Sequence, residues 1–529
     1  MNDLNYNKIQ LNHRYHFINM NTLFDNHSKV NIHTDSIFIK FAPLVDPIRY
    51  LIGKIDAASE DVRRLPTYEE NAKGKLWDSN NASYVDNFFC YLSGQLLQHH
   101  GFVHGLEYYG SFLAIQEKFR VNVADDLSYL MQHEYFRKNK GILYEIEEIE
   151  DPFSNFGSRN NKQKLVMEDA EDIVLEDVQE LVFDDITTTN NAETVDIVEP
   201  SNVEIELNID NINDKDICDI GDNDSEEDNG SEIDFSGSES QNSESKSGSE
   251  SGSESGSESG SESESELDSE PELDTHLAYI YNYPTQMICL EKCEGTLDEL
   301  FMMEEMDEKI GNDMLAQIIF ILITYQKAFH FTHNDLHTNN IMWVKTDLQY
   351  LYYRFNKKVY RVPTNGRIFK IIDFGRSIYK FKGNVLCSNS FAPEGDASTQ
   401  YNFGPYYNPD KPILEPNYSF DLCRLATSIY DFVLDERDDI KHTNKNGDSF
   451  QKVIYRWILD DNKNNVLYKR SGEERYPGFK LYKMIARTVH DATPSEQLKT
   501  APFSQYLYKS KQTPANIFDI DLIPDYTLP

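Results

Sequence analysis

The 529-residue sequence predicts a mixed α+β fold that is interrupted by a long acidic insertion. Short apolar runs typical of strands alternate with longer runs whose apolar residues have helical spacing. Acidic residues are concentrated in one segment, because residues 145–274 hold 42 Asp and Glu against 5 Lys and Arg, and the other residues hold 48 against 45. The net charge of −40 therefore belongs to this segment. The nearly neutral remainder does not suggest a nucleic-acid-binding surface, which needs clustered Lys and Arg.

Residues 1–144 are expected to combine strands with one long helix. Residues 36–41 (SIFIKF) are typical of a strand, and this strand carries Lys40. Residues 106–113 are also typical of a strand. Between them, residues 84–100 predict a helix, because apolar side chains recur at helical spacing at Val85, Phe88, Phe89, Leu92, Leu96 and Leu97.

Residues 145–274 are predicted to be disordered. Their first part alternates acids with aliphatic residues, as in 172–177 (DIVLED) and 203–207 (VEIEL), and their second part is a Ser-Gly-Ser-Glu repeat over about residues 243–266. Such stretches cannot bury enough apolar area to offset the entropy of the chain. Two roles remain open: a solvated spacer, or a docking segment that binds partners or is phosphorylated by acid-directed kinases.

Ordered structure is expected to resume in residues 275–529. Residues 287–291 (MICLE) are typical of a strand, residues 292–295 of a connector, and Thr296 of a helix N-cap. A long apolar helix over residues 315–331 should lead directly into a polar loop. The remaining predictions are strands over 341–344 and 368–372, a hairpin over 350–363 between them, and mainly helical structure after that.

Two polar motifs follow these apolar runs. The first is His333-Asn334-Asp335-Leu336-His337-Thr338-Asn339-Asn340, and the second is Asp373-Phe374-Gly375. The carboxylate of Asp335 can orient a hydroxyl and accept its proton, whereas the side-chain oxygens of Asn340 and Asp373 suit the metal ions that bridge phosphates. This set of residues predicts transfer of a phosphoryl group from Mg-ATP.

The motifs and the order of elements resemble the eukaryotic-type protein kinases, whose catalytic loop reads His-Arg-Asp-x-x-x-x-Asn and is followed by Asp-Phe-Gly. The resemblance covers most of the chain except the insertion. It implies a two-lobed fold with a small antiparallel-sheet N-lobe, a mainly helical C-lobe and ATP in the cleft between them. Residues 1–144 would form the first part of the N-lobe, and residues 275–529 would form its end, the hinge and the C-lobe.

The resemblance also implies roles for individual residues. Asp335 would be the catalytic base within a loop braced by His333, and Asn340 and Asp373 would bind Mg²⁺. Lys40 would contact the α and β phosphates of ATP. The hinge that meets adenine would consist of Glu291, Lys292, Cys293 and Glu294. Asp421 would either anchor the backbone of the catalytic loop or serve as a helix N-terminal acid favoured by the helix dipole.

Two parts of an ordinary nucleotide site are not evident in the sequence. No glycine-rich loop precedes Lys40, since the first glycine is Gly53. The helix glutamate that should pair with this lysine is also missing. Asp86 is the nearest candidate for that partner, and Glu69 and Glu70 are alternatives.

The catalytic loop also resembles particular groups within this family. His337 stands where ordinary protein kinases have Lys, as in haspin-like protein kinases and in aminoglycoside- and choline-kinase-like enzymes. The run Phe420-Asp421-x-x-Arg424-Leu425 also resembles the haspin-like group. Together with residues 291–297 (EKCEGTL), the loop looks most like provisionally assigned serine/threonine kinases of large nucleocytoplasmic DNA viruses.

The expected function is that of an ATP- and Mg²⁺-dependent serine/threonine protein kinase whose protein substrate could be basic. A small-molecule kinase, suggested by His337, and a pseudokinase scaffold, suggested by the missing glycine loop, remain alternatives. The six cysteines are scattered without a Cys-x-x-Cys pair, the first residues lack a secretory signal, and no run of about 18 apolar residues occurs. These features predict an intracellular, cytoplasmic protein without a membrane partner, located in the host cytoplasm or the virion if the chain is viral.

Overall fold

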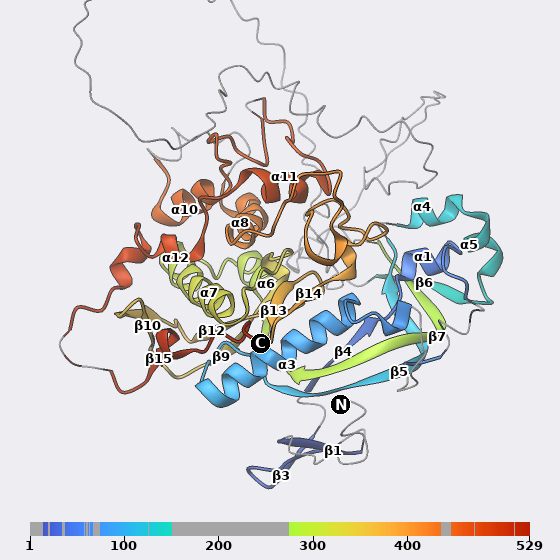
Figure 1. Cartoon of the computed structure of the whole chain (residues 1–529), viewed down its shortest axis with the longest axis horizontal. Helices are drawn as coiled ribbons and strands as arrows, with labels where there is room; N and C mark the ends of the chain where they lie inside the picture. The colour runs from blue at the N-terminus through green and yellow to red at the C-terminus, as the bar shows by residue number, and fades with distance from the viewer. Residues whose placement is uncertain are drawn as a thin grey trace, which may run out of the picture. The chain divides into compact units, whose positions relative to one another are not determined.

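The computed structural model describes residues 14–150 and 274–529, except for residues 20–21, 34–36, 58, 60–61, 63, 67–74, 125, 435–445, 470, 511 and 513. The described residues form a mixed α+β fold with several antiparallel sheets (Figure 1), as the sequence predicts. The predicted disorder of residues 145–274 lies mostly outside the described residues.

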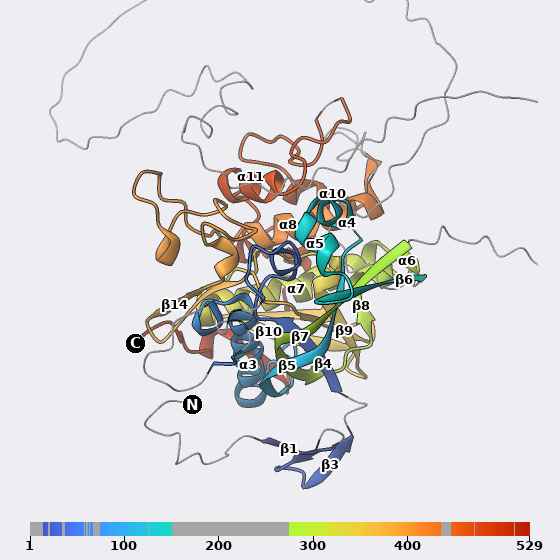
Figure 2. The same cartoon turned by 90° about the vertical axis from the view of Figure 1, so that its right-hand side faces the viewer.

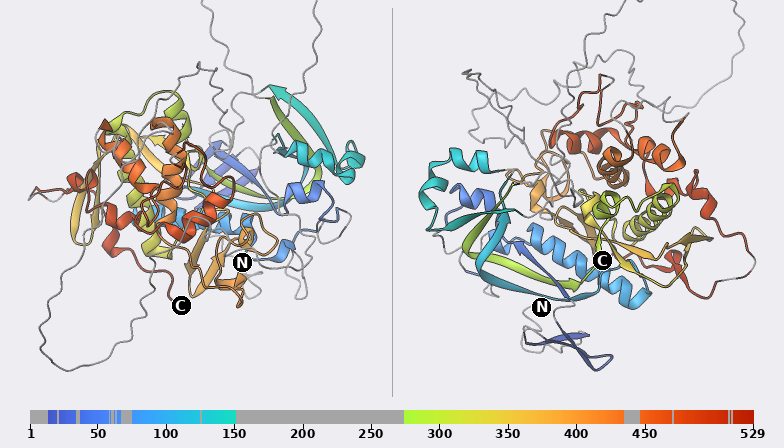
Figure 3. Two further views of the ribbon diagram at one scale, coloured as in Figure 1. Left: turned by 90° about the horizontal axis from the view of Figure 1, so that it is seen from above. Right: turned by 180° about the vertical axis from the view of Figure 1, so that it is seen from behind.

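The main sheet of the N-terminal half consists of four strands in antiparallel pairs. These strands are β4 (Ile37–Pro43), β5 (Tyr108–Asn122), β6 (Tyr144–Glu150) and β7 (Asp274–Glu291). β5 lies along one edge of β7, whereas β4 and β6 pair with opposite ends of its other edge. Figure 3 shows the cyan strands β5 and β6 beside green β7 in both views. Lys40 consequently lies opposite Ile288, close to the end of β7 that leads into the predicted hinge.

The start of the insertion was predicted wrongly. Residues 145–150 were expected to be disordered, but they belong to β6, in which Tyr144 pairs with Ile280 and Glu150 pairs with Asp274. Tyr144 is buried and Glu145 is exposed, as in a strand with one covered face. The ladder places residues 150 and 274 opposite one another. The entropy cost of closing the loop between them rises only slowly with its length, so a long insertion is tolerated at this position.

One long helix, α3 (Ala82–His100), packs against this sheet (Figure 1). The side chain of Asn81 caps its first turn by accepting a hydrogen bond from the N–H of Ser83. The helix ends at Gly101, whose φ of 68° is left-handed and strains a residue with a side chain. The helix predicted over 84–100 is therefore confirmed, and it begins two residues earlier.

Smaller groups of elements flank the two ends of the sheet. At the end near β6, α1 (Pro47–Leu51), α4 (Leu127–Gln132) and α5 (Glu134–Asn139) surround a separate apolar core. At the end near β4, a three-stranded sheet is formed by β1 (Tyr15–Asn19), β2 (Thr22–Asp25) and β3 (Val30–His33). Its aromatic rings contact the main sheet, because Tyr15 packs on Tyr109 and Phe17 on Phe112.

The C-terminal half contains three further small sheets. One consists of β8 (Gly295–Thr296), β9 (Ile341–Lys345) and β12 (Arg367–Ile371). Another is the predicted hairpin of β10 (Tyr350–Phe355) and β11 (Lys358–Pro363), to which β15 (Ile517–Asp519) adds in parallel. The third is a hairpin of β13 (Ile378–Phe381) and β14 (Asn384–Cys387). The predicted strands over 341–344 and 368–372 and the predicted hairpin are confirmed, whereas β13, β14 and β15 lie where mainly helical structure was expected.

The helices of this half surround the largest apolar core. They are α6 (Leu297–Met302), α7 (Glu308–Phe329), α8 (Phe420–Val433), α10 (Ser449–Trp457), α11 (Lys480–Thr488) and α12 (Pro494–Gln497). Short 3-10 turns cover Lys75–Trp77, Thr338–Asn340, Asn389–Phe391, Gly404–Tyr406, Phe503–Tyr506 and Ile520–Leu522. α8 contacts both α10 and α11 (Figure 2), and α10 also contacts α7.

Helix α7 begins earlier than the predicted start at residue 315. Asp307 caps it by accepting a hydrogen bond of 2.7 Å from the N–H of Ile310. The polar residues that follow obscured the helical pattern, yet they are buried with partners elsewhere in the fold. Asp313, for example, accepts hydrogen bonds from Tyr506 at 2.6 Å and from Asn365 at 2.9 Å.

Two expectations about the bulk of the chain can be compared with the structure. The described cysteines, Cys90, Cys289, Cys293, Cys387 and Cys423, are free thiols. Among the described helices, none combines the length and the apolar character that crossing a membrane requires.

Candidate active site

A buried carboxylate fixes the start of the polar loop 333–340. Asp421 lies in the first turn of α8, is fully buried, and accepts hydrogen bonds of 2.9 Å from the backbone N–H groups of both His333 and Asn334. Burial raises the pKa of Asp421, and these two hydrogen bonds oppose that rise. Of the two roles left open for Asp421, the geometry is that of a loop anchor.

His333 joins the two polar motifs. Its ring is fully buried, with Nε2 2.9 Å from the carbonyl oxygen of Ile372, the residue before Asp373. Its Nδ1 accepts a hydrogen bond of 3.3 Å from the N–H of Asp335. The ring therefore fixes the distance between the carboxylates of the first and second motifs, as expected of a bracing residue.

Asp335 is surrounded by groups that favour its charged form. The hydroxyl of Tyr482 donates a hydrogen bond of 2.7 Å to its Oδ1. Arg424 Nε lies 3.9 Å from the same oxygen, and Arg376 Nη1 lies 3.8 Å from Oδ2. Burial alone would raise the pKa of Asp335, but the two arginines, His337 and the Tyr482 hydrogen bond outweigh it and hold the pKa below its usual range. The side chain is therefore a carboxylate at neutral pH and can accept a hydrogen bond.

Asn340 and His337 hold each other at the end of the loop. The Nδ2 of Asn340 donates to the carbonyl oxygen of Asp335 at 2.9 Å and lies 3.1 Å from Nε2 of His337. Burial lowers the pKa of His337 to about 4, against the opposing charge of Asp335. The imidazole is consequently neutral near pH 7, and its Nε2 can accept from the amide. Since the amide nitrogen of Asn340 makes these two contacts, the amide oxygen of Asn340 remains available to another partner.

Lys40 connects the main sheet to the second motif. Its Nζ lies 2.7 Å from Oδ2 of Asp86 on α3 and 2.8 Å from Oδ1 of Asp373. Burial would lower the pKa of Lys40, but the two carboxylates raise it instead, so the side chain stays charged. Of the candidate acidic partners, Asp86 makes the contact, whereas Glu69 and Glu70 lie outside the described residues.

Asp86 also holds the second motif directly. It is buried, and its Oδ1 accepts a hydrogen bond of 2.9 Å from the backbone N–H of Phe374. The preceding residue, Asp373, has a φ of 60°, a left-handed conformation that costs on the order of 1–3 kcal/mol for a residue other than glycine. Partial loss of hydration would raise the pKa of Asp373, whose carboxylate is still half-exposed, and the charge of Lys40 lowers it below its ordinary value. The motif is thus held in a strained turn by α3 and β4.

An aromatic cluster positions α3 against the two motifs. The ring of Phe89 stacks on Phe331 with centroids 4.3 Å apart, and it packs on Phe374 at 4.6 Å. All three rings are buried. Because Phe89 lies one turn beyond Asp86 on α3, the cluster fixes the helix that presents Asp86 to Lys40.

The predicted hinge residues follow the end of β7. The carboxylate of Glu291 accepts hydrogen bonds from Lys370 at 2.6 Å and from the N–H of Glu107 at 2.9 Å, so its side chain is used within the fold. Lys292 is exposed, and Cys293 is partly buried. Burial raises the pKa of the Cys293 thiol to about 12, so the thiol is protonated at neutral pH. The carboxylate of Glu291 is therefore engaged within the fold rather than free to bind a ligand.

Two side chains of the site offer oxygen atoms that could bind a divalent metal ion. The described residues contain no group of three or more His, Cys, Asp or Glu side chains that could hold a metal ion by themselves. Asp373, whose side chain is 48% exposed, and Asn340 instead offer a carboxylate and an amide oxygen. Mg²⁺ prefers such hard ligands and commonly takes the rest of its shell from water and phosphate oxygens. The donor set fits Mg²⁺ shared with a nucleotide.

The sequence did not identify three residues around Asp335. Tyr482 lies in α11, far from any motif, and nothing in its local sequence indicates this contact. Arg424 belongs to the run after Asp421 but carried no assigned role. Arg376 directly follows the second motif, so the positions of the two arginines beside recognised motifs are the signals by which they could have been found.

Comparisons with known proteins give short similarities. No protein-family model matches the chain. Haspin of Mus musculus, a serine/threonine-protein kinase, is 34% identical over 105 residues, which cover 18% of this chain and 14% of haspin. Haspin of Bos taurus is 34% identical over 89 residues, which cover 16% and 11% of the two chains. A protein of Acanthamoeba polyphaga mimivirus, provisionally named a serine/threonine-protein kinase, is 32% identical over 128 residues, which cover 23% and 29%.

The matched segments span less than a third of each of these relatives. The similarities support a protein-kinase-like family for this chain.

Proposed function

We propose that this protein is an ATP- and Mg²⁺-dependent serine/threonine protein kinase. The observation that best supports the proposal is the network of contacts among Lys40, Asp335, Asn340 and Asp373. Lys40 contacts Asp373, and Asn340 donates to the backbone of Asp335. His333 connects the two motifs, since it contacts both Asp335 and Ile372. The kinase names of the relatives support the same general class.

The proposed fold is the two-lobed arrangement of protein kinases. The β4–β7–β5 sheet and α3 would form the small lobe, and the elements from β8 onward would form the large lobe. Residues 291–294 would connect them, and their backbone groups would meet adenine. Lys40, held by Asp86, would donate to phosphate oxygens of ATP. No glycine-rich loop precedes Lys40 in the sequence to supply the backbone N–H groups that usually bind the phosphates.

The residues of the loop would act on a hydroxyl of the substrate. Mg²⁺, when bound by Asn340 and Asp373, neutralises charge on the phosphates. Asp335 orients the attacking hydroxyl and accepts its proton while the hydroxyl oxygen approaches the γ-phosphorus in line. The arginines beside Asp335 keep it charged, which makes it a weak base suited to orienting the hydroxyl early in the reaction.

The negative charge of the insertion indicates which class of substrate to test first. We propose a protein substrate, and a basic protein is the first to test, because the insertion carries an excess of 37 acids over bases. No nucleic acid or membrane is assigned as a partner. Free thiols in all five described cysteines suit an intracellular, cytoplasmic site of action.

The decisive experiment is transfer of labelled γ-phosphate from Mg-ATP to a panel of basic and acidic proteins. Wild type is compared with Asp373→Asn and Asp335→Asn, two variants that preserve side-chain volume. We expect transfer to Ser or Thr by the wild type and losses of about a hundredfold or more in both variants. Thermal unfolding of each variant separates loss of chemistry from loss of fold.

Three outcomes would contradict the proposal. Normal turnover by Asp335→Asn would remove the assigned base. Transfer to sugars, choline or aminoglycosides but to no protein would indicate a small-molecule kinase. Absence of both transfer and ATP binding with any divalent metal would indicate a pseudokinase scaffold.

A further inference from the structure

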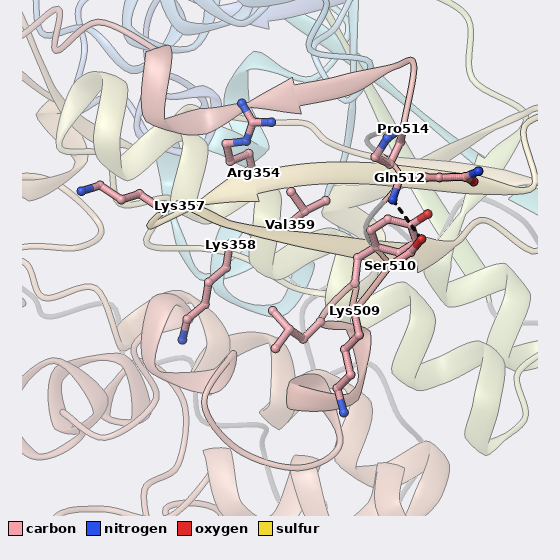
Figure 4. Close-up of a pocket in the computed structure, with 10 residues that line it drawn as sticks. Arg354, Lys357, Lys358, Val359, Lys509, Ser510, Gln512 and Pro514 are labelled. Carbon is pink, nitrogen blue, oxygen red and sulfur yellow. Dashed lines mark hydrogen bonds between the residues drawn. The ribbon is translucent and has the colours of Figure 1, made fainter.

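A basic groove lies between the hairpin of β10 and β11 and the chain segment that begins at residue 507. Its volume is about 510 Å³. Its rim carries the cationic side chains of Arg354, Lys357, Lys358 and Lys509 (Figure 4). None of the residues that line it belongs to the candidate active site. The basic groove is therefore a separate candidate for a binding site.

Backbone hydrogen bonds hold the two walls of the basic groove in place. The N–H of Tyr508 donates a hydrogen bond of 2.8 Å to the carbonyl oxygen of Val359 and so ties one wall to the other. At the tip of the hairpin, the N–H groups of residues 356 and 357 donate hydrogen bonds of 2.8 Å to the carboxylate of Asp521. The backbone that carries the cationic side chains is thus fixed by contacts within the fold.

The positive charge of the basic groove is only partly neutralised. The chain has 90 acidic residues, but none of them occurs in residues 348–372 or 497–518, the two stretches that form the walls. Arg354 pairs with Asp519 at 2.6 Å. In the part of the chain that the structure describes, by contrast, no carboxylate lies within ion-pair distance of Lys357, Lys358 or Lys509. The rim therefore attracts an anionic ligand.

The cationic side chains are spread around the basic groove. In Figure 4 the side chains of Lys358 and Lys509 extend toward the same side, whereas Lys357 extends in another direction. A compact anion, such as a single phosphate group, would contact only part of this set. An extended chain that carries several carboxylates can pair with all three lysines. The arrangement consequently favours an acidic peptide over a small anion.

The floor of the basic groove is mainly aliphatic. Its half-buried apolar residues are Val359, Leu507 and Pro514. Tyr508 also lines the groove, but its ring already packs on Tyr352, with centroids 5.6 Å apart. Sites for single-stranded nucleic acids stack bases on aromatic rings, whereas an aliphatic floor suits the aliphatic side chains of a peptide.

We propose that the basic groove is a docking site for an extended acidic segment of a partner protein, with aliphatic residues among its acids. Carboxylates of this segment pair with the lysines of the rim, and its aliphatic side chains cover the floor. Because exposed ion pairs are individually weak, several of them and the apolar contacts act together. This inference does not depend on the proposed kinase activity.

Fluorescence anisotropy with the full-length protein tests the proposal. The ligand is a fluorescein-labelled dodecapeptide in which each leucine is preceded by two glutamates. We expect saturable binding whose Kd rises about threefold or more between about 50 and 500 mM NaCl, since salt screens exposed ion pairs. Lys357→Glu with Lys358→Glu should raise the Kd about tenfold or more, because two attractions become repulsions. The charge-matched control, Lys309→Glu with Lys480→Glu, changes exposed lysines outside the groove and should alter the Kd less than about twofold.

Two further ligands separate docking from general attraction by charge. The same peptide with serine in place of leucine keeps every carboxylate but cannot cover the apolar floor, so its Kd should be about fivefold higher or more. A single-stranded DNA dodecamer should bind more weakly than the leucine peptide. A benzophenone group on the leucine peptide should, after illumination, label residues 354–359 and 507–514, which mass spectrometry maps.

Several results would overturn the proposal. These are absence of binding, equal weakening by the two pairs of lysine variants, an unchanged Kd for the serine peptide, and labelling outside the groove. Tighter binding of the DNA, lost in Lys357→Glu with Lys358→Glu, would show that the groove is a nucleic-acid site instead. Circular dichroism of each variant shows whether the fold is retained, and the labelling of the wild type locates the site without any substitution.

Discussion

The hydroxyl of Tyr482 donates a hydrogen bond of 2.7 Å to Oδ1 of Asp335, a residue 147 positions earlier in the chain. Among the described residues, no group donates a hydrogen bond to the other carboxylate oxygen, Oδ2, which faces Arg376 at 3.8 Å. The two oxygens therefore differ in their surroundings. In the proposed kinase, Oδ1 is held by the fold, and Oδ2 is left to accept the hydrogen bond of the substrate hydroxyl.

Tyr482→Phe should reduce turnover without weakening nucleotide binding. The variant loses the hydrogen bond that orients Asp335 but keeps the ring, which packs on Arg424 at 5.0 Å and on Arg376 at 5.7 Å. We expect kcat to fall about tenfold and the KM for ATP to change less than about twofold. Initial-rate kinetics measure both, with exposed Tyr407→Phe as the control. An unchanged kcat would show that Tyr482 does not position the carboxylate.

Asp86→Asn should weaken nucleotide binding, because it removes a charge that holds Lys40 without changing side-chain volume. The Oδ1 position can still accept from Phe374, so the second motif remains held. We expect the Kd for Mg-ATP to rise about tenfold or more, a loss of at least ~1.4 kcal/mol. Titration calorimetry measures this Kd, and exposed Glu415→Gln, outside the proposed site, is the control for loss of one negative charge. An unaltered Kd in a folded Asp86→Asn protein would contradict the role given to the Lys40–Asp86 pair.

The sequence was most informative where one short segment contains the whole pattern. The loop 333–340 carries its own spacing and lies directly before a strand, so Asp335 and Asn340 could be found without knowledge of the fold. The hairpin over 350–363 was likewise predictable, because alternation and a polar turn define it locally. By contrast, Asp86 could only be proposed as the nearest acid to a lysine 46 residues away, and the contact depends on how α3 packs.

Contacts between residues that lie far apart in the chain could not be predicted from the sequence. Helical spacing in α11 predicts a helix but does not indicate that Tyr482 reaches Asp335. The start of α7 was missed because Asn312 and Asp313 interrupt the apolar pattern. Their partners are distant in sequence, since Asn312 donates to Ser449 of α10 and Asp313 accepts from residues 365 and 506. β6 was missed because its acids resemble those of the insertion, and its pairing with β7 decides its structure.

Asp421→Asn should destabilise the fold as well as the loop. Both carboxylate oxygens of Asp421 accept backbone hydrogen bonds. The amide nitrogen of asparagine would replace one of these oxygens, and it cannot accept a hydrogen bond from the backbone N–H group that faces it. Since one buried N–H then lacks a partner, we expect the free energy of unfolding to fall by about 2–4 kcal/mol. Urea denaturation followed by circular dichroism measures the loss. Exposed Asp410→Asn should change stability by less than ~0.5 kcal/mol, and an equally small loss for Asp421→Asn would refute the anchor.

His104 should make the protein less stable at acidic pH. The ring is fully buried, with Nδ1 2.7 Å from the carbonyl oxygen of Phe369 and Nε2 2.6 Å from the Tyr353 hydroxyl, contacts that suit a neutral imidazole. Burial lowers its pKa to about 3, whereas an unfolded histidine has a pKa of about 6.5. Below pH 6.5 the unfolded chain binds a proton that the folded protein excludes. The stabilisation is therefore complete above pH 6.5 and declines as the pH falls toward 3, by up to about 1.4 kcal/mol per pH unit.

Urea denaturation of wild type and His104→Gln between pH 7.5 and 4.5 tests this origin of acid sensitivity. The variant loses buried hydrogen bonds at every pH but has no imidazole to protonate. The difference in unfolding free energy between the two proteins should therefore narrow by roughly 2–3 kcal/mol from pH 6.5 to 4.5. The contribution of His337, whose pKa is also lowered, is common to both proteins and cancels. Exposed His99→Gln should follow the wild-type curve. A difference that stays constant with pH would mean that His104 is protonated in the folded protein, against its contacts with Phe369 and Tyr353.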